Sequence, residues 1–119
     1  MTGALVNGAG DVVCPRCAVA DNAPARMKGL LGRRGLEPGE GLLLRPAGSV
    51  HTAFMRFPID AVFLDRDLTV LGVSADLGPW RAASRRRARA VLELAAGESA
   101  RRGIAPGDRL SLVANGDGP

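Results

Sequence analysis

The sequence predicts an α+β domain with a mostly antiparallel, curved or barrel-like β-sheet and one or two short helices. Short apolar segments bounded by turn residues outnumber the segments with helical spacing. The two kinds of segment do not alternate regularly, which argues against a parallel α/β sheet. The run Ile59–Leu64 is apolar at every position except Asp60, a pattern typical of a strand that is buried on both faces. We therefore expect the sheet to be built around this central strand.

The N-terminal segment predicts a β-hairpin. Ala4–Val6 and Asp11–Val13 flank Asn7–Gly10, whose Asn and Gly residues permit the positive φ angles of a tight turn. The second arm continues through Val19. Because Pro15 cannot donate a ladder hydrogen bond, we expect it to mark either an edge strand or a bulge.

A short helix is expected next, over about residues 23–31. Asp21 and Asn22 can cap its first turn, and Met27, Leu30 and Leu31 have the spacing of a buried stripe. The remaining elements are predicted from apolar runs and turn residues. They are a loop at Leu36–Gly41, a strand at Leu42–Leu44, the partner of the central strand at Leu68–Val73, a loop at Ala75–Ser84, a strand at Ala90–Leu94, a helical turn at Gly97–Arg102 and a last strand at Arg109–Val113.

Length and composition bound the class of protein. With 119 residues, we expect one domain over residues 1–113 and a disordered, Gly-rich tail over residues 114–119. Aromatic residues make up only 3% of the chain, so Leu, Val and Ala must fill most of the core. The sequence contains no apolar run of transmembrane length and no signal-peptide pattern. We expect a cytoplasmic, monomeric bacterial protein.

The charge balance is basic, with a net charge of +4 and a cluster at Arg85–Arg87 and Arg89. Such a cluster can bind phosphates or acidic partners. Little aromatic interleaving accompanies it, and the chain contains no recognisable nucleic-acid module. We therefore favour a solvated loop and do not expect nucleic-acid binding.

Four motifs, in order along the chain, resemble those of one protein family. Residues 26–33, RMKGLLGR, look like its early R-x-x-G-L-[ML]-G-R element, and Val50–Asp65 looks like a central element that ends in I-D-x-x-F-[LI]-D. Pro79-Trp80 follows at a similar distance, and residues 91–97 with Gly107-Asp108 look like its closing element. The chain thus resembles the bacterial and archaeal family called domain of unknown function 192. The resemblance implies a compact, strand-rich α+β domain and no established activity.

The same central element concentrates the side chains that could carry chemistry. It holds the only histidine and all three phenylalanines of the chain. We expect a cleft around residues 50–60, VHTAFMRFPID. The ligand-binding candidates in or near it are His51, Thr52, Met55, Arg56, Asp60, Trp80 and Glu93.

Asp60 has the most unusual position of these residues. A buried carboxylate must accept hydrogen bonds, pair with a cation, or raise its pKa and stay neutral. We favour a structural Asp60 that accepts backbone N–H groups or pairs with an arginine such as Arg56. The functional alternative is an acid or base with His51 or Glu93 as its second titrating group. We expect either Asp60 or Glu93 to pair with an arginine, Arg33 or Arg56.

Two further features allow more than one interpretation. Cys14-Pro15-Arg16-Cys17 is a C-x-x-C motif, for which we favour structural cysteines over a metal half-site with His51 and over a reversible disulfide. Trp80 beside Arg81 is either a ligand-stacking pair on a loop or a tryptophan that closes one end of a small barrel. We slightly favour the barrel interpretation.

Two functional hypotheses follow. The first is a non-enzymatic accessory module that binds a small molecule or a protein through the cleft around residues 50–60, without a cofactor. Its basis is the absence from the sequence of hydrolase, P-loop, dinucleotide and zincin motifs. The alternative is an enzyme, or a metal-dependent or redox protein, that uses His51, Asp60 and the Cys14/Cys17 pair.

Overall fold

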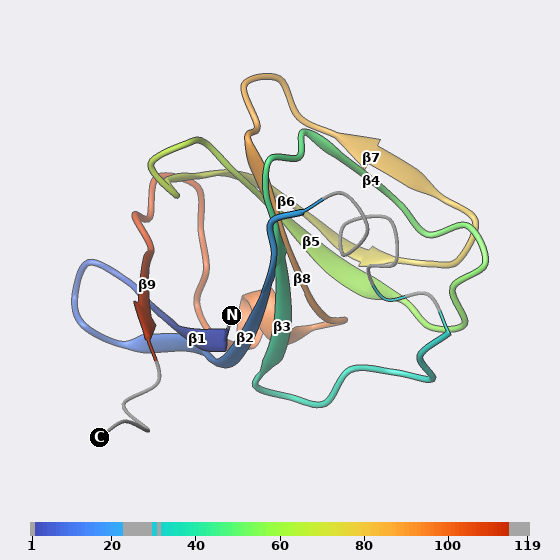
Figure 1. Cartoon of the computed structure of the whole chain (residues 1–119), viewed down its shortest axis with the longest axis horizontal. Coiled ribbons are helices and arrows are strands. Elements are labelled where there is room, and N and C mark those ends of the chain that lie inside the picture. Colours follow the sequence, from blue (N-terminus) through green and yellow to red (C-terminus); the bar gives the residue numbers. More distant parts are fainter. Residues whose placement is uncertain (1, 23–29, 31, 115–119) are drawn as a thin grey trace.

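The computed structural model describes residues 2–22, 30 and 32–114, and a strongly twisted mixed sheet dominates them (Figure 1). The strand order in this sheet is β6-β5-β8-β3-β2-β1-β9. The strands are β1 (Thr2–Val6), β2 (Val12–Ala20), β3 (Glu40–Leu44), β5 (Ile59–Leu64), β6 (Val70–Leu77), β8 (Ala90–Ala95) and β9 (Ser111–Ala114).

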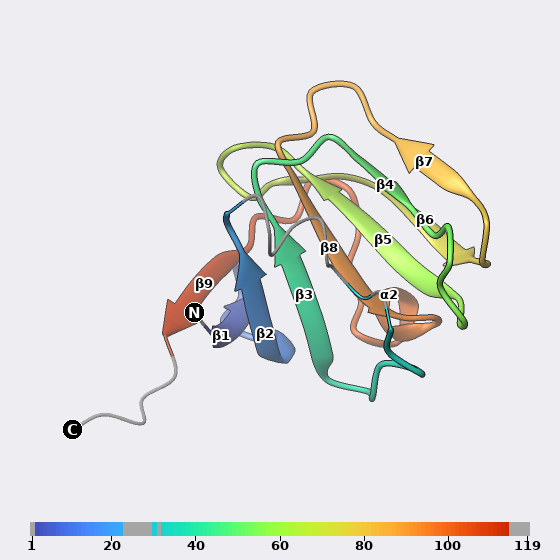
Figure 2. The same cartoon turned by 45° about the vertical axis from the view of Figure 1, so that its right-hand side comes forward.

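Two smaller elements complete the described part of the chain. Strands β4 (Ser49–His51) and β7 (Ala82–Ser84) form a separate antiparallel ribbon, and α2 (Glu98–Arg101) is a single helical turn. Figures 1 and 2 show the ribbon beside β5 and β6, away from β1 and β9. The helix predicted over residues 23–31 falls largely outside the described residues.

The prediction of a central buried strand is confirmed. All six residues of β5 are buried, and the strand pairs antiparallel with β6 on one side and with β8 on the other. Val62 and Leu64 pack into the first of two cores, on one face of the sheet. Ile59, Ala61 and Phe63 pack into a second core on the opposite face, which the β4–β7 ribbon helps to cover.

The sheet is curved, but it does not close into the expected barrel. Its edge strands β6 and β9 approach each other only near one end, at a bridge between Thr69 and Arg109. There the backbone N–H of Leu110 donates to the carbonyl of Leu68 over 2.9 Å. The sheet is also mixed, because β2 and β3 run parallel while its other strand pairs are antiparallel.

Pro15 marks a bulge and not an edge strand. Strand β2 lies between β1 and β3, so the edge interpretation is wrong. Gly3 pairs with Cys17 and Leu5 with Cys14, so two steps along β1 oppose three steps along β2. The extra residue of this bulge accommodates a proline inside an interior strand.

The other predicted strands are found with shifted limits. β6 continues to Leu77, and β7 occupies part of the segment predicted as a loop at Ala75–Ser84. The predicted helical turn is confirmed as α2. Ala114 belongs to β9, and residues 115–119 of the predicted tail lie outside the described residues.

Close packing at Gly41 provides a test of the core. A Cβ atom at this position would lie 2.7 Å from Sγ of Cys14 and 2.9 Å from Cδ2 of Leu94. We expect Gly41→Ala to lower the free energy of unfolding by about 1–3 kcal/mol through overpacking. Urea unfolding of this variant and of Gly8→Ala, whose new Cβ meets no atom within 4 Å, will measure the difference. Equal stability of the two variants would contradict the packing described here.

Candidate functional site

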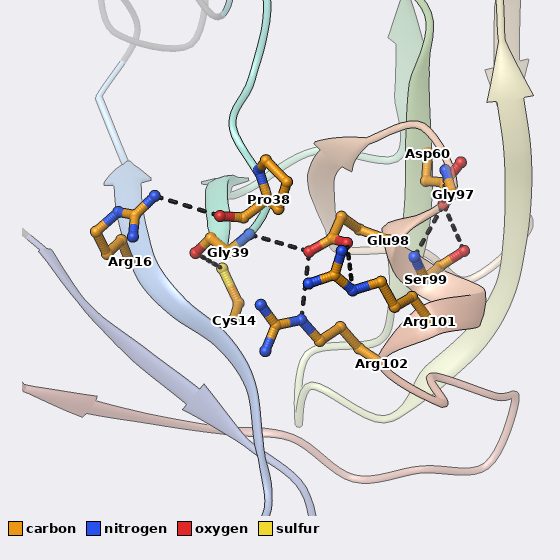
Figure 3. Close-up of polar contacts among 10 residues, drawn as sticks. All are labelled: Cys14, Arg16, Pro38, Gly39, Asp60, Gly97, Glu98, Ser99, Arg101 and Arg102. Carbon is orange, nitrogen blue, oxygen red and sulfur yellow. Dashed lines mark hydrogen bonds and ion pairs between the residues drawn. The ribbon is translucent and has the colours of Figure 1, made fainter.

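The carboxylate of Asp60 is fully buried and fully engaged in hydrogen bonds. Its Oδ1 accepts from the backbone N–H of Asp76 over 2.9 Å. Its Oδ2 accepts from the N–H groups of Gly97 and Ser99 and, over 2.6 Å, from the Ser99 hydroxyl. Figure 3 shows the contacts with Ser99. Since Gly97 is the N-cap of α2, Asp60 caps this helix from a distant strand.

These contacts decide the protonation state of Asp60. Burial pushes the pKa of a carboxylate up, but the Ser99 hydroxyl and the three backbone N–H groups favour the charged form more strongly, so the pKa of Asp60 lies below its usual range. The structural interpretation, with backbone N–H groups as partners, describes what this carboxylate does.

Glu98 makes a second set of polar contacts at the same helix. Its Oε1 accepts from the backbone N–H of Gly39 over 3.0 Å and from Nε of Arg102 over 3.3 Å. Its Oε2 lies 3.4 Å from Nε of Arg101. Figure 3 shows Glu98 between the two arginines and the Gly39 loop. The helix is thereby tied to the loop that precedes β3.

Glu93 is buried on the face of the sheet opposite to Asp60. Glu93 pairs in register with Ala61 and Leu42, which pack in the second core. Asp60 instead pairs with Leu94, which packs in the first core. Within the described residues, its Oε1 has no hydrogen-bond partner. Burial raises the pKa of Glu93 to about 7. Within the described part of the chain, which includes Arg33 and Arg56, neither Asp60 nor Glu93 pairs with an arginine, so that expectation is wrong.

The two cysteines are buried in the first core and are not bonded to each other. In a regular strand, residues three apart point to opposite faces, but the Pro15 bulge turns Cys14 and Cys17 into the same core. A hydrogen bond between the thiols lowers the pKa of Cys14, while the same contact and burial raise that of Cys17. The structure does not bring His51 to this pair, because His51 is exposed on β4.

Thr52 fastens two loops together at the end of the β4–β7 ribbon. Its buried hydroxyl donates to the carbonyl of Gly78 over 2.6 Å and accepts from the backbone N–H of Arg81 over 2.8 Å. Its backbone N–H donates to the Arg81 carbonyl, and its carbonyl accepts from the N–H groups of Met55 and Trp80. Met55 itself is buried in the second core, so neither of these two candidates is free for a ligand.

An exposed aromatic pair lies on the two loops that Thr52 joins. Phe54 is 72% exposed and Trp80 is 64% exposed, and their ring centroids are 4.6 Å apart at an interplanar angle of 61°. Both residues have left-handed backbone conformations, with φ of 65° and 62°. Trp80 therefore does not close the end of a barrel. We call Phe54, Trp80 and the exposed residues His51, Arg56 and Arg81 on the same segments the aromatic surface.

The predicted candidates thus fall into separate places. His51, Arg56 and Trp80 belong to the aromatic surface, Thr52 and Met55 lie beneath it, Asp60 caps α2, and Glu93 lies in the second core. No group of three or more His, Cys, Asp and Glu side chains in the described part of the chain is arranged to hold a metal ion. Sequence reasoning missed Phe54, Glu98 and Ser99. Phe54 resembled a core residue, and the partner of Asp60 lies 39 residues away.

Comparisons with known proteins place this structure in a family. The model of DUF192, described as an uncharacterized ACR, matches residues 5–112. A protein of unknown function from Novosphingobium aromaticivorans is 26% identical with a TM-score of 0.78, covering 93% of this chain and 84% of that one. A protein from Sinorhizobium meliloti, described as a putative transcription regulator, is 26% identical with a TM-score of 0.81, covering 93% and 92%. No curated protein matches the chain.

Among the described residues, no helix has the length and apolar character needed to cross a bilayer.

The role of Asp60 can be tested by Asp60→Leu. This change leaves the N–H groups of Asp76, Gly97 and Ser99 without their acceptor, and we expect the free energy of unfolding to fall by about 1–3 kcal/mol. Ser99→Ala, which removes only one of the four hydrogen bonds, should cost less. Chemical denaturation of both variants measures the effects. An Asp60→Leu protein as stable as the wild type would show that the capping role is wrong.

The buried Glu93 predicts an unusual dependence of stability on pH. A carboxyl whose folded pKa is about 7, against an ordinary value of 4.5, stabilises the fold while it is protonated. That stability is lost as the pH rises from 4.5 to 7, and the loss amounts to about 3 kcal/mol. We expect Glu93→Gln to remove this decline, so that the variant gains on the wild type as the pH rises. Urea unfolding at several pH values across this window measures both curves, and parallel curves would contradict the assignment.

Proposed function

The chain belongs to the DUF192 family of uncharacterised proteins, and from this premise we propose that it is a non-enzymatic binding module. Its recognition site is the aromatic surface built on the Val50–Asp65 segment and the loop around Trp80. The observation that carries the proposal is the exposure of Phe54 and Trp80 in a chain with so few aromatic residues. Large aromatic side chains are among the residues that contribute most to binding at protein interfaces.

The backbone at these two residues supports a role other than packing. A residue other than glycine in the left-handed region costs of order 1 kcal/mol or more. The described chain has five such residues, and Phe54, Trp80 and Arg87 are three of them. The rings of Phe54 and Trp80 are mostly exposed, so burial of apolar surface does little to offset this cost. The strain is instead compatible with side chains that are held outward for a partner.

The surroundings of the pair are rigid and positively charged. The buried Thr52 hydroxyl fixes the two loops relative to each other, which lowers the entropy that a partner must overcome. Arg56 and Arg81 are exposed next to the aromatic residues in the chain. This combination supports an anionic partner with apolar or planar groups.

The enzymatic alternative has less support from the same geometry. His51, Asp60 and the Cys14/Cys17 pair would have to converge, yet Asp60 is committed to α2 and the cysteines to the first core. His51 remains available to the aromatic surface, where an imidazole can contribute hydrogen bonds.

Stability measurements can distinguish the role of Thr52, which joins the two loops, from that of Phe54, which belongs to the aromatic surface. We expect Thr52→Val to lower the free energy of unfolding by about 1–3 kcal/mol, because it leaves the N–H of Arg81 and the carbonyl of Gly78 without their side-chain partner. We expect Phe54→Gly to leave stability unchanged or to raise it by up to about 1 kcal/mol, because it relieves the strain. A marked loss of stability in Phe54→Gly would show that the ring serves the fold.

Binding itself can be followed at Trp80, the only tryptophan. The indole N–H signal of a ¹⁵N-labelled protein would be recorded against acidic peptides, oligonucleotides, anionic oligosaccharides and sugar phosphates. We expect at least one class to shift this signal saturably in the wild type and not in Phe54→Gly. If none of the classes shifts it, the proposed function is wrong.

A further inference from the structure

We infer that the partner of the aromatic surface is a single-stranded nucleic acid, whose bases stack on Trp80 and Phe54 and whose phosphates contact arginines of the same two chain segments. The inference rests on the proposed function and names its class of ligand. It departs from the sequence-based expectation, because the folded chain places exposed aromatic residues beside a basic surface that the sequence shows as separate features.

Positive charge is concentrated in the two chain segments that carry the aromatic surface. Residues 49–58 and 78–89 contain six of the 16 Lys and Arg residues of the chain and none of its 12 Asp and Glu residues. The rest of the chain therefore has ten basic residues against twelve acidic ones. The positive net charge of the protein arises entirely from the segments that form the β4–β7 ribbon and its adjoining loops.

These cations are not neutralised by ion pairs within the described part of the fold. The ion pairs of the described residues involve Arg16, Arg33, Arg101 and Arg102, all outside the two segments. Arg56, Arg81, Arg86 and Arg87 are exposed and take part in none of them. Arg85 is the exception in its loop, since its guanidinium lies over the ring of Phe63 at 5.9 Å. With Arg89, which is also exposed and takes part in none of these ion pairs, five arginines remain available for a polyanion.

The β4–β7 ribbon offers a path between the aromatic and arginine-rich ends. A shallow surface hollow of about 380 Å³ follows the two strands. Small side chains and the single histidine form most of its lining, which consists of Ser49, Val50, His51, Ala82, Ala83 and Ser84. Figures 1 and 2 show that β7 leads from the loop beside β4 to the long loop before β8, so that the ribbon connects the two ends. A flexible polyanion can follow this path.

The aromatic pair favours single strands over other polyanions. Proteins that bind single strands combine a basic path for the backbone with exposed rings on which bases stack, and arginine adds cation–π contacts. Bases inside a duplex are already stacked and do not offer their faces. An acidic peptide would satisfy the arginines but would supply no planar rings unless its sequence contained them. The combination of exposed rings and unpaired arginines therefore points to unstacked bases.

Trp80 fluorescence provides the direct experiment. The wild-type protein is titrated with a 12-residue oligothymidylate at several salt concentrations, and we expect saturable quenching of Trp80. Each phosphate contact on a single strand contributes about 0.7 to the slope of log affinity against log salt. We expect Arg86→Ala/Arg87→Ala to weaken binding roughly tenfold or more and to reduce that slope by about 1.4.

A matched control separates this path from net charge. Arg66→Ala/Arg109→Ala removes the same charge from exposed positions outside the two segments, and it should weaken binding much less. Phe54→Gly keeps all the arginines and the fluorescent reporter, and it should weaken binding through lost stacking. Equal losses in the two double-arginine variants would mean undirected attraction and would overturn the inference.

Two further ligands distinguish the inference from the function on which it rests. A polyglutamate peptide that quenches Trp80 while the oligothymidylate does not would identify an acidic protein partner, which overturns the nucleic-acid inference and leaves the binding module standing. A blunt-ended duplex that binds as tightly as the single strand would overturn the stacking argument. If neither the oligothymidylate nor the peptide perturbs Trp80, the inference fails, and the broader ligand panel decides the proposed function.

Discussion

One buried carboxylate joins the central strand of the sheet to α2 and to the end of β6. Asp60 stands in the central strand β5 and accepts hydrogen bonds from Asp76 at the far end of β6 and from the first turn of α2. A helix of four residues cannot persist alone, because nucleation costs more than so few hydrogen bonds return. Asp60 supplies the capping acceptor that the N-cap residue Gly97 lacks, and Gly97, with φ of 92°, permits the turn that presents the N–H groups. Glu98 then extends the connection from α2 to Gly39 before β3.

Asp60 and Glu93 show how neighbouring contacts set the pKa of a carboxylate in an apolar strand. In the sequence the two residues look alike, each a single acid in an apolar run. Asp60 meets four donors and its pKa falls, whereas Glu93 meets none among the described residues and its pKa rises to about 7. The pairing of β5 with β8 places them on opposite faces of the sheet. One carboxylate therefore stabilises the fold in its charged form, and the other does so only while it is protonated.

The sequence predicts the elements of this fold better than their partners. Local chemistry locates the hairpin at Asn7, whose Oδ1 accepts from Ala9 and Asp11, and continuous apolarity locates β5. The parallel pairing of β2 with β3 and the β4–β7 ribbon depend on contacts between distant segments, which leave no local pattern. The same limit applies to the candidate site. Phe54 and Met55 are adjacent apolar residues, yet the left-handed backbone at Phe54 turns one ring outward while Met55 enters the core.

Thr52 marks the boundary between the buried core and the exposed aromatic surface. On one side of it, β5 and β8 bury nearly every side chain, and residues of β6 and α2 complete the hydrogen bonding of Asp60. On the other side, Phe54 and Trp80 expose their rings on a strained backbone. Strained, exposed loops keep a single geometry only where buried contacts determine it, and the Thr52 hydroxyl with its contacts to Gly78 and Arg81 supplies those contacts. The buried contacts thus hold an aromatic, basic surface in one arrangement, which the proposed recognition of a partner requires.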